Sequence, residues 1–127
     1  MIPKILIVDD DEDIVPLFTQ MFKNELKNGL YEFIFKFSAS EANQYVQSVP
    51  AGTISLMLSD IRMPDKNGIE LLKELREKSD IPVFLFTAYD DEVVRKSAEF
   101  FKANKYFQKP INFTELRQEI KNIVVTK

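Results

Sequence analysis

The sequence contains no cysteine and no histidine, and it also lacks tryptophan. The absence of cysteine excludes disulfide bonds and thiolate chemistry, which suits a reducing cytoplasm. The absence of histidine removes imidazole as a base, a metal ligand or a phosphoryl carrier. Any mechanism that depends on imidazole therefore has to take it from another molecule.

The chain also lacks long apolar runs and an excess of positive charge. No segment approaches the roughly 20 apolar residues of a membrane span, and the amino terminus becomes acidic too early for a secretory signal. The net charge of −3 does not indicate a surface for nucleic acid or for an anionic membrane. With 127 residues, of which 45% are hydrophobic, we expect one soluble domain over residues 1–127. The absence of cysteine suits a cytoplasmic location, which we also expect.

Chemically active residues follow four segments that are typical of strands. They are Asp9 and Asp10 after Lys4–Val8, Asp60 after Thr53–Ser59, Thr87 after Pro82–Phe86, and Lys109 after Lys105–Gln108. In open parallel sheets, ligands bind beyond the carboxyl ends of the strands. We therefore expect these side chains to converge on one site.

The remaining segments predict the rest of an α/β fold. In Tyr31–Phe37 every second residue is aromatic, which is typical of an edge strand with unequal faces. Five strands alternating with helices imply a parallel sheet with helices on both faces. We expect helices at about Asp13–Lys27, Ser40–Gln47 with Ser40 as cap, Gly68–Lys78, Asp90–Ala103 with Asp90 as cap, and from Asn112 onward with Asn112 and Glu115 as a capping box.

Three carboxylates at one site repel one another, at about 4 kcal/mol per pair of unit charges about 4 Å apart and an effective dielectric near 20. We therefore expect a cation beside Asp9, Asp10 and Asp60. With oxygen ligands only, the matching ion is Mg²⁺, with Mn²⁺ as the alternative. Lys109 adds positive charge, and Thr87 adds a hydroxyl that can bind a phosphoryl oxygen. Such a carboxylate can accept a phosphoryl group.

The order and spacing of these motifs resemble the receiver domain of two-component response regulators over essentially the whole chain. The resemblance implies the flavodoxin-like receiver fold, an α/β fold with a five-stranded parallel sheet in the order 2-1-3-4-5 and helices on both faces. It rests on Ile5–Asp10, Leu56–Asp60, Met63-Pro64, Gly68, Phe84–Ala88 and Tyr106–Pro110.

The resemblance implies that Asp60 is the phosphoacceptor and that Asp9 and Asp10 hold Mg²⁺. Arg62, two residues beyond the phosphoacceptor, would ligate the ion through its backbone carbonyl. Taken singly, each of these residues has an ordinary structural explanation, such as an acidic loop that caps a helix. Their joint occurrence at strand ends favours the functional interpretation.

The resemblance also implies a switch. Thr87 and Lys109 match the switch hydroxyl and the lysine of the family's phosphoryl site, and Tyr106 matches the aromatic residue that changes rotamer. The Lys109–Pro110 bond is expected to be cis, for which an X–Pro bond costs only about 0.5–1 kcal/mol.

The implied phosphoryl donor is a sensor histidine kinase or a histidine phosphotransfer protein, since this chain has no histidine. Phosphorylation would alter the surface formed by the fourth helix, fifth strand and fifth helix, which would contact an output domain, a partner protein or a second copy of the chain. We expect the partner surface near Lys102, Lys105 and Arg117, and we expect no direct contact with nucleic acid or membrane. The resemblance also implies that the phosphorylated domain hydrolyses its own acyl phosphate, so we expect a phosphoacceptor with autodephosphorylation and not a turnover enzyme.

Two features depart from the family pattern. Lys102–Lys105 lacks the glycine that the family often has before the fifth strand, which affects the shape of that loop. Arg62 and Tyr89 are bulky at two positions that tune phosphoryl lifetime in this family, so the fold alone does not set that lifetime.

One alternative is a haloacid-dehalogenase-like phosphatase with Asp9 as the nucleophile and Asp11 as the second aspartate. However, Asp13 stands where that family has Thr or Val, and no late acidic pair follows Lys109.

Three further alternatives fit the sequence less well than a receiver domain does. An EF-hand would need glycine at Ile14 and glutamate at Gln20. A flavodoxin-like FMN site needs a Ser/Thr/Gly-rich loop, whereas five successive acids at Asp9–Asp13 would repel phosphate. A pseudo-receiver that acts only by binding is the non-enzymatic alternative, although every residue type of the acceptor site is present.

Overall fold

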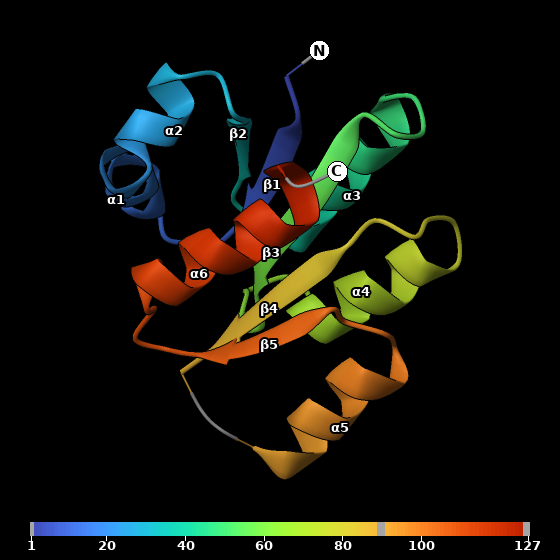
Figure 1. Ribbon diagram of the computed structural model, residues 1–127. Coiled ribbons are helices and arrows are strands. Elements are labelled where there is room, and N and C mark those ends of the chain that lie inside the picture. Colours follow the sequence, from blue (N-terminus) through green and yellow to red (C-terminus); the bar gives the residue numbers. More distant parts are fainter. Residues whose placement is uncertain (1, 89–90, 126–127) are drawn as a thin grey trace.

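The computed structural model describes residues 2–88 and 91–125. The strands are β1 (Lys4–Val8), β2 (Glu32–Lys36), β3 (Ile54–Asp60), β4 (Val83–Thr87) and β5 (Lys105–Gln108). They form one parallel sheet in the order β2-β1-β3-β4-β5, which confirms the expected fold (Figure 1). The aromatic-rich strand β2 lies at an edge, also as expected.

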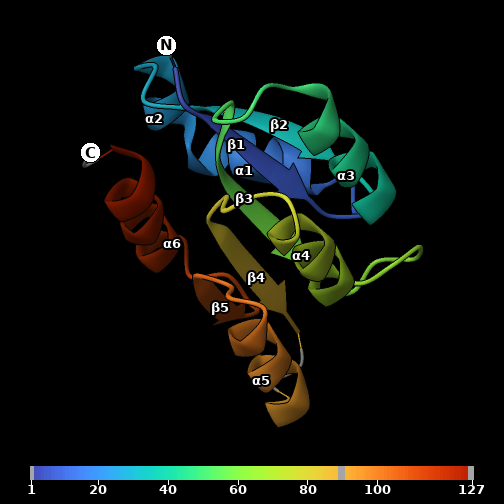
Figure 2. The same ribbon diagram turned by 90° about the vertical axis from the view of Figure 1, so that its right-hand side faces the viewer.

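Helices cover both faces of this sheet. They are α1 (Ile14–Met21), α2 (Lys23–Lys27), α3 (Ala39–Ser48), α4 (Gly68–Arg76), α5 (Glu92–Phe100) and α6 (Phe113–Ile120), which continues as a π-helical segment over Lys121–Val125. Figures 1 and 2 show α1, α2 and α6 on one face and α3, α4 and α5 on the other. None of the helices in the described part of the chain is long and apolar enough to span a bilayer.

The buried apolar residues form two clusters, one on each face of the sheet. On the first face, Phe18 and Phe22 pack with Leu116 and Ile120 of α6. On the second face, apolar residues of α3 and α4 pack with Ala98 of α5. Successive residues of β1 and β3 belong to different clusters, so these central strands are apolar on both sides. Burial on both sides explains their continuous apolar sequences and fixes the positions of their ends.

The helix expected over Asp13–Lys27 is divided at Phe22, whose φ of −111° departs from helical geometry. The physical reason is aromatic packing. The Phe22 ring is fully buried and makes edge contacts with Phe33 at 5.5 Å and Phe113 at 6.0 Å between ring centroids. These partners are distant in sequence, so helical periodicity did not reveal the break.

Two expected helix caps are corrected by the structure. The cap of α3 is Ser38, which accepts the Glu41 N–H, whereas Ser40 lies inside the first turn. The cap of α5 is Asp91, which accepts the Val93 N–H at 2.8 Å, while the expected cap Asp90 lies outside the described residues. In both cases a neighbouring residue of the same cap-forming chemistry takes the position.

For α6, half of the expected capping box is described: Asn112 accepts the Glu115 N–H at 3.1 Å, without the reciprocal hydrogen bond from the Asn112 N–H to the Glu115 carboxylate. A capping box that the sequence analysis did not anticipate opens α4, where Asn67 and Glu70 each accept the other's backbone N–H.

The turn after α5 contains Lys102 in the left-handed region, with φ of 66°. The Ala103 N–H bonds the Ala98 carbonyl at 2.9 Å, the pattern of a Schellman cap that normally has glycine at the left-handed position. The turn is anchored from outside by Arg76, whose guanidinium donates to the Lys102 carbonyl at 2.9 Å and to the Ile81 carbonyl at 2.7 Å. The missing family glycine therefore leaves the turn intact but with a lysine in strained backbone.

We expect Lys102→Gly to raise the free energy of unfolding by about 0.5–1 kcal/mol, because glycine adopts positive φ without a Cβ clash. Urea denaturation measures this change. Lys102→Ala is the matched control, because it removes the same charge but keeps the Cβ. If alanine stabilises the protein as much as glycine does, backbone strain is not the cause.

Candidate functional site

Three carboxylates lie together at the carboxyl edge of the sheet. Asp9 and Asp10 follow β1, and Asp60 ends the neighbouring strand β3. One carboxylate oxygen from each residue lies within 4.8 Å of the others. Asp9 is buried, Asp60 is partly buried and Asp10 is exposed. The structure therefore brings together the acids expected from the sequence.

Lys109 is the cation that contacts this cluster. Its Nζ lies 3.2 Å from Oδ2 of Asp60 and 3.9 Å from Oδ2 of Asp9. Each carboxylate pair at about 4 Å costs roughly 4 kcal/mol at an effective dielectric near 20, and each attraction to the lysine is of similar size. One ammonium group therefore offsets only part of the repulsion among three carboxylates.

Asp9 shows the cost of this arrangement most clearly. Burial raises the pKa of its carboxyl group, and the charges of Asp60 and Asp10 raise it further. The hydrogen bond from the Asp11 N–H, at 2.9 Å, and the charge of Lys109 lower this pKa but do not cancel the rise. The ionised form of Asp9 is therefore held at an energetic cost that a divalent cation would offset.

Main-chain hydrogen bonds hold the strand ends in register beside these carboxylates. The residue after Asp60, Ile61, donates its N–H to the Phe86 carbonyl at 2.9 Å. Lys109 donates its N–H to the Thr87 carbonyl at 2.7 Å. Main-chain hydrogen bonds thus fix the ends of β3, β4 and β5 relative to one another, in addition to the contact of Lys109 with Asp60.

The other expected residues lie as follows. Thr87 is buried at the end of β4, one position beyond the partner of Asp60 in the sheet. The Tyr106 ring packs against the core cluster on the sheet face that α3, α4 and α5 cover. Its hydroxyl oxygen is buried, so this ring points inward. The Lys109–Pro110 bond is cis, as expected. Arg62 is exposed in the loop after β3, and Tyr89 lies outside the described residues.

A cleft of about 630 Å³ opens over the carboxylates. Its lining includes Lys109 and an apolar wall formed by Ile14 and Leu17 of α1 and Phe113 of α6. Sequence analysis missed this wall. The available signal was the apolar pair at i and i+3 directly after the acidic loop, which was assigned to no function.

Gly68, the first residue of α4, approaches the site more closely than any side chain would allow. A Cβ at this position would lie 2.5 Å from the Asp60 carbonyl oxygen and 3.1 Å from Ile61 Cα, both backbone atoms. The Gly68 N–H also donates to the Ile61 carbonyl at 2.8 Å. The glycine after the Met63-Pro64 motif therefore lets α4 start directly against the backbone of the phosphoacceptor candidate.

The grouping of the acids distinguishes among the alternative sites. An EF-hand would gather Asp9, Asp11 and Asp13, whereas the candidate metal cluster of the described residues joins Asp9 and Asp10 to Asp60 from a different strand. The donors are carboxylate oxygens, which fit Mg²⁺ or Mn²⁺.

Comparisons with known proteins agree with this geometry. The response regulator receiver domain family model matches residues 5–121. The chain is 31% identical over 126 residues to transcriptional regulatory protein AruR of Pseudomonas aeruginosa, covering 98% of this chain and 50% of that protein. It is 34% identical over 121 residues to transcriptional regulatory protein CpxR of Escherichia coli K12, covering 95% and 49%.

A solved structure shares the fold. It is a CheY-like response regulator receiver domain protein from Methanospirillum hungatei, with a TM-score of 0.83, 28% identity, and coverage of 96% of this chain and 93% of that one. The curated relatives described above carry the names of regulators rather than of turnover enzymes, and this chain spans about half of their length.

We expect Gly68→Ala to lower the free energy of unfolding by about 1–3 kcal/mol, because backbone atoms of Asp60 and Ile61 would have to move. Urea denaturation measures the loss. Gly52→Ala is the control, since its cost comes from the positive φ of 87°, which Gly68 does not have, while its Cβ would lie in open space away from the site. Loss of divalent-cation binding in the Gly68 variant alone would show that the close approach shapes the site. Equal binding in both variants would contradict this.

We expect Asp9→Asn to raise the Tm in metal-free buffer by roughly 2–5 °C, the size of a change near 1 kcal/mol, because it removes one of three crowded charges. Asparagine can still accept the Asp11 N–H. Mg²⁺ should raise the Tm of the wild type but scarcely that of the variant. Asp13→Asn, which removes an exposed charge outside the cluster, should change neither quantity by much. A lower Tm for Asp9→Asn in metal-free buffer would show that repulsion does not dominate here.

Proposed function

The chain belongs to the response regulator receiver domain family of two-component signalling, and on that basis we propose that Asp60 accepts a phosphoryl group. One observation carries the proposal above the others. The Asp60 carboxylate lines an open cleft, 3.2 Å from the Lys109 ammonium and within reach of two further carboxylates. A nucleophilic oxygen with charge-neutralising neighbours is what phosphoryl transfer requires.

We propose Mg²⁺ as the resident ion, with Mn²⁺ as the alternative. Asp9, Asp10 and Asp60 would hold it together with the backbone carbonyl of Arg62. When bound, such an ion neutralises charge on phosphoryl oxygens in the transition state. The fit of the donor set is supported by the raised pKa of Asp9, which is caused first by burial and then by the charges of Asp60 and Asp10, because a bound cation would favour the ionised carboxylate.

The chain's own residues have distinct tasks in the proposed transfer. A carboxylate oxygen of Asp60 forms the new P–O bond while the P–N bond of a phosphohistidine breaks and the imidazole leaves. Lys109 stabilises the charge on the phosphoryl oxygens, and the Thr87 hydroxyl hydrogen-bonds one of them. The phosphohistidine belongs to a sensor histidine kinase or a histidine phosphotransfer protein, since this chain has no histidine. Attack of water on the acyl phosphate would later release phosphate, without making the protein a turnover enzyme.

Phosphorylation would bias a switch formed by Thr87 and Tyr106. Thr87 would move toward the phosphoryl group, and the inward Tyr106 ring would be favoured behind it. The inward position of the ring in this structure is therefore the arrangement that the phosphorylated state would stabilise. The response is a shift between two packings, so its size depends on how often the inward ring is populated beforehand.

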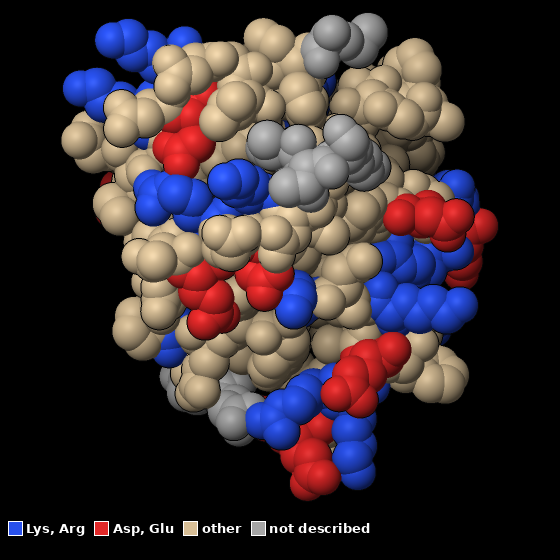
Figure 3. All heavy atoms as spheres, in the orientation of Figure 1, with Lys and Arg blue, Asp and Glu red and all other residues tan. Residues whose placement is uncertain are grey.

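The affected surface is formed by α5, β5 and α6, and we propose that it contacts an output domain, a partner protein or a second copy of the chain. Val93 and Phe100 of α5 support this, because they are large apolar residues that are 72% and 78% exposed. Near them, over α5, basic and acidic side chains are interspersed (Figure 3). Lys105 is part of this surface through β5, whereas the Arg117 side chain of α6 is paired with Glu25 of α2, on the face of the sheet opposite α5.

We propose a cytoplasmic location and a receiver domain that extends over residues 1–127, without direct contact to nucleic acid or membrane. The curated relatives named above are transcriptional regulatory proteins about twice as long as this chain. By analogy, the chain would control an output through another domain or another protein. A pseudo-receiver is the second candidate, and only chemistry at Asp60 separates the two.

Incubation with acetyl phosphate and Mg²⁺ should give one phosphoryl adduct in intact-mass spectrometry. Asp60→Asn should abolish it because the nucleophilic oxygen is lost, and chelation of the metal should reduce it by at least about 10-fold. Asp80→Asn, at an exposed acid on the far edge of the sheet, is the control and should be labelled normally. Labelling that persists in Asp60→Asn would refute the site, and a folded wild type that is never labelled would favour the pseudo-receiver.

A further inference from the structure

The loop between β3 and α4, residues 61–67, begins directly after Asp60 and carries Arg62. Its two ends are close together, because the Gly68 N–H bonds the Ile61 carbonyl at 2.8 Å. The course of the loop between those ends determines where the Arg62 carbonyl lies. Contacts made by the middle of the loop therefore bear directly on the proposed metal site.

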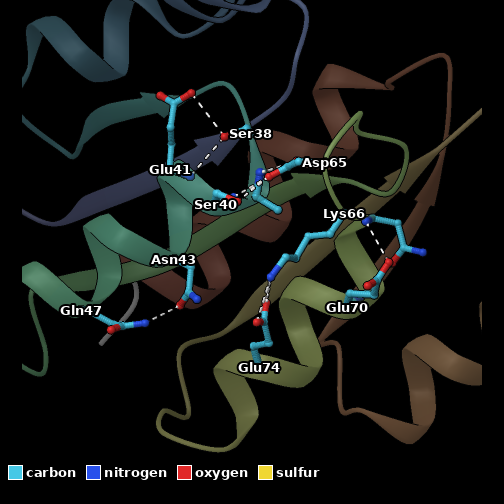
Figure 4. A network of polar contacts seen from close by, with 11 residues as sticks. Ser38, Ser40, Glu41, Asn43, Gln47, Asp65, Lys66, Glu70 and Glu74 are labelled. Carbon is cyan, nitrogen blue, oxygen red and sulfur yellow. Dashed lines mark hydrogen bonds and ion pairs between the residues drawn. The ribbon is translucent and has the colours of Figure 1, made fainter.

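Asp65, near the middle of this loop, binds the start of α3 (Figure 4). Its Oδ2 accepts the Ser40 N–H at 2.9 Å and the Ser40 hydroxyl at 2.7 Å. Its Oδ1 accepts the Ala39 N–H at 3.3 Å. Three donors at one helix end are thus satisfied by a carboxylate that is 25 and 26 positions away in the chain.

A carboxylate suits this position for physical reasons. The first backbone N–H groups of a helix have no partner within it, and the helix dipole favours negative charge at that end. The Ser40 hydroxyl and N–H hold the pKa of Asp65 well below its usual range, so the group is ionised at neutral pH. The contact is therefore a set of charge-assisted hydrogen bonds.

Two other polar contacts stay within the loop and α4. Lys66 pairs with both carboxylate oxygens of Glu74 at 2.9 and 3.0 Å (Figure 4), and Asn67 forms a capping box with Glu70. The Ile61 N–H, which bonds the Phe86 carbonyl at 2.9 Å, ties the first residue of the loop to β4. Asp65 differs from them because it joins the loop to a different helix.

The start of α3 is itself tied to the acidic residues after β1. The Asp9 N–H donates to the carbonyl of Lys36, the last residue of β2, at 3.1 Å. Only two residues separate Lys36 from Ala39, the first residue of α3. The contact of Asp65 therefore links the loop that carries Arg62 to the strand ends that carry Asp9.

We propose that Asp65 is a positioning residue for the divalent cation: it ties the 61–67 loop to α3 and thereby holds the Arg62 carbonyl in place. The inference rests on the proposed function, in which that carbonyl is a ligand. Loss of the Asp65 carboxylate should weaken Mg²⁺ binding about 10-fold, the lower end of what the outer partners of metal ligands contribute. Labelling of Asp60 should then need more Mg²⁺ but recover at saturation.

The test is calorimetric titration of Mg²⁺ into the wild type, Asp65→Ala, Asp65→Asn and Ser38→Ala. Ser38→Ala is the matched control, because Ser38 caps the same helix end through the Glu41 N–H at 3.1 Å while its described hydrogen bonds stay within α3. A cap is worth about 1 kcal/mol, so both alanine variants should lose similar stability. Only the Asp65 variants should bind Mg²⁺ more weakly, with Asp65→Asn affected less because it keeps one acceptor oxygen.

Amide hydrogen exchange without metal gives a second measurement. Exchange in residues 61–67 should accelerate in Asp65→Ala but not in Ser38→Ala. Equal Mg²⁺ affinity for Asp65→Ala and Ser38→Ala, with the wild type binding Mg²⁺ and accepting label at Asp60, would overturn this inference alone. A wild type that binds no Mg²⁺ would overturn the proposed metal site as well.

Discussion

The contact of the Lys109 ammonium with the carboxylates of Asp60 and Asp9 is the interaction on which the site depends. The acids come from the two central strands, and the lysine follows the edge strand β5, so the contact reaches across the end of β4. Without it, this edge of the sheet would lose an ammonium group that offsets part of the repulsion among three carboxylates. The sheet tolerates this edge because β1 and β3, which carry the acids, are largely buried on both sides.

The close approach of α4 has a related origin. Gly68 brings the start of the helix against the Asp60 backbone, while Leu71, Leu72 and Leu75 pack the same helix into one of the two cores. Packing energy from these leucines therefore holds the backbone segment that carries Asp60, the proposed phosphoacceptor. Core packing also fixes the position of Thr87, because the strand that it ends, β4, is buried along its whole length. Stability and function are thus coupled through strand and helix ends, where the core stops and the cleft begins.

Features that depend on a single segment could be predicted from the sequence. The strand ends follow from such segments. The sheet order came from the family resemblance, and the meeting of Asp9, Asp10 and Asp60 follows from that order combined with the strand ends. Features that depend on distant partners could not. Ser40 is a residue type that often caps helices, but its hydroxyl donates to the carboxylate of Asp65 instead. Phe22 interrupts a helix because its ring packs against rings on other elements.

The anchoring of Lys102 by Arg76 has a mechanical consequence for α5. Arg76 fixes the carboxyl end of this helix to the α4–β4 connection, while the opposite end of α5 follows Thr87 along the chain. A displacement that starts at Thr87 would therefore turn α5 about a fixed point rather than carry it sideways. The amino-terminal end of α5, which follows Thr87 along the chain, would then move farthest. A shift of a fraction of an ångström there would tilt the exposed side chains of α5 with little disturbance of the core beneath.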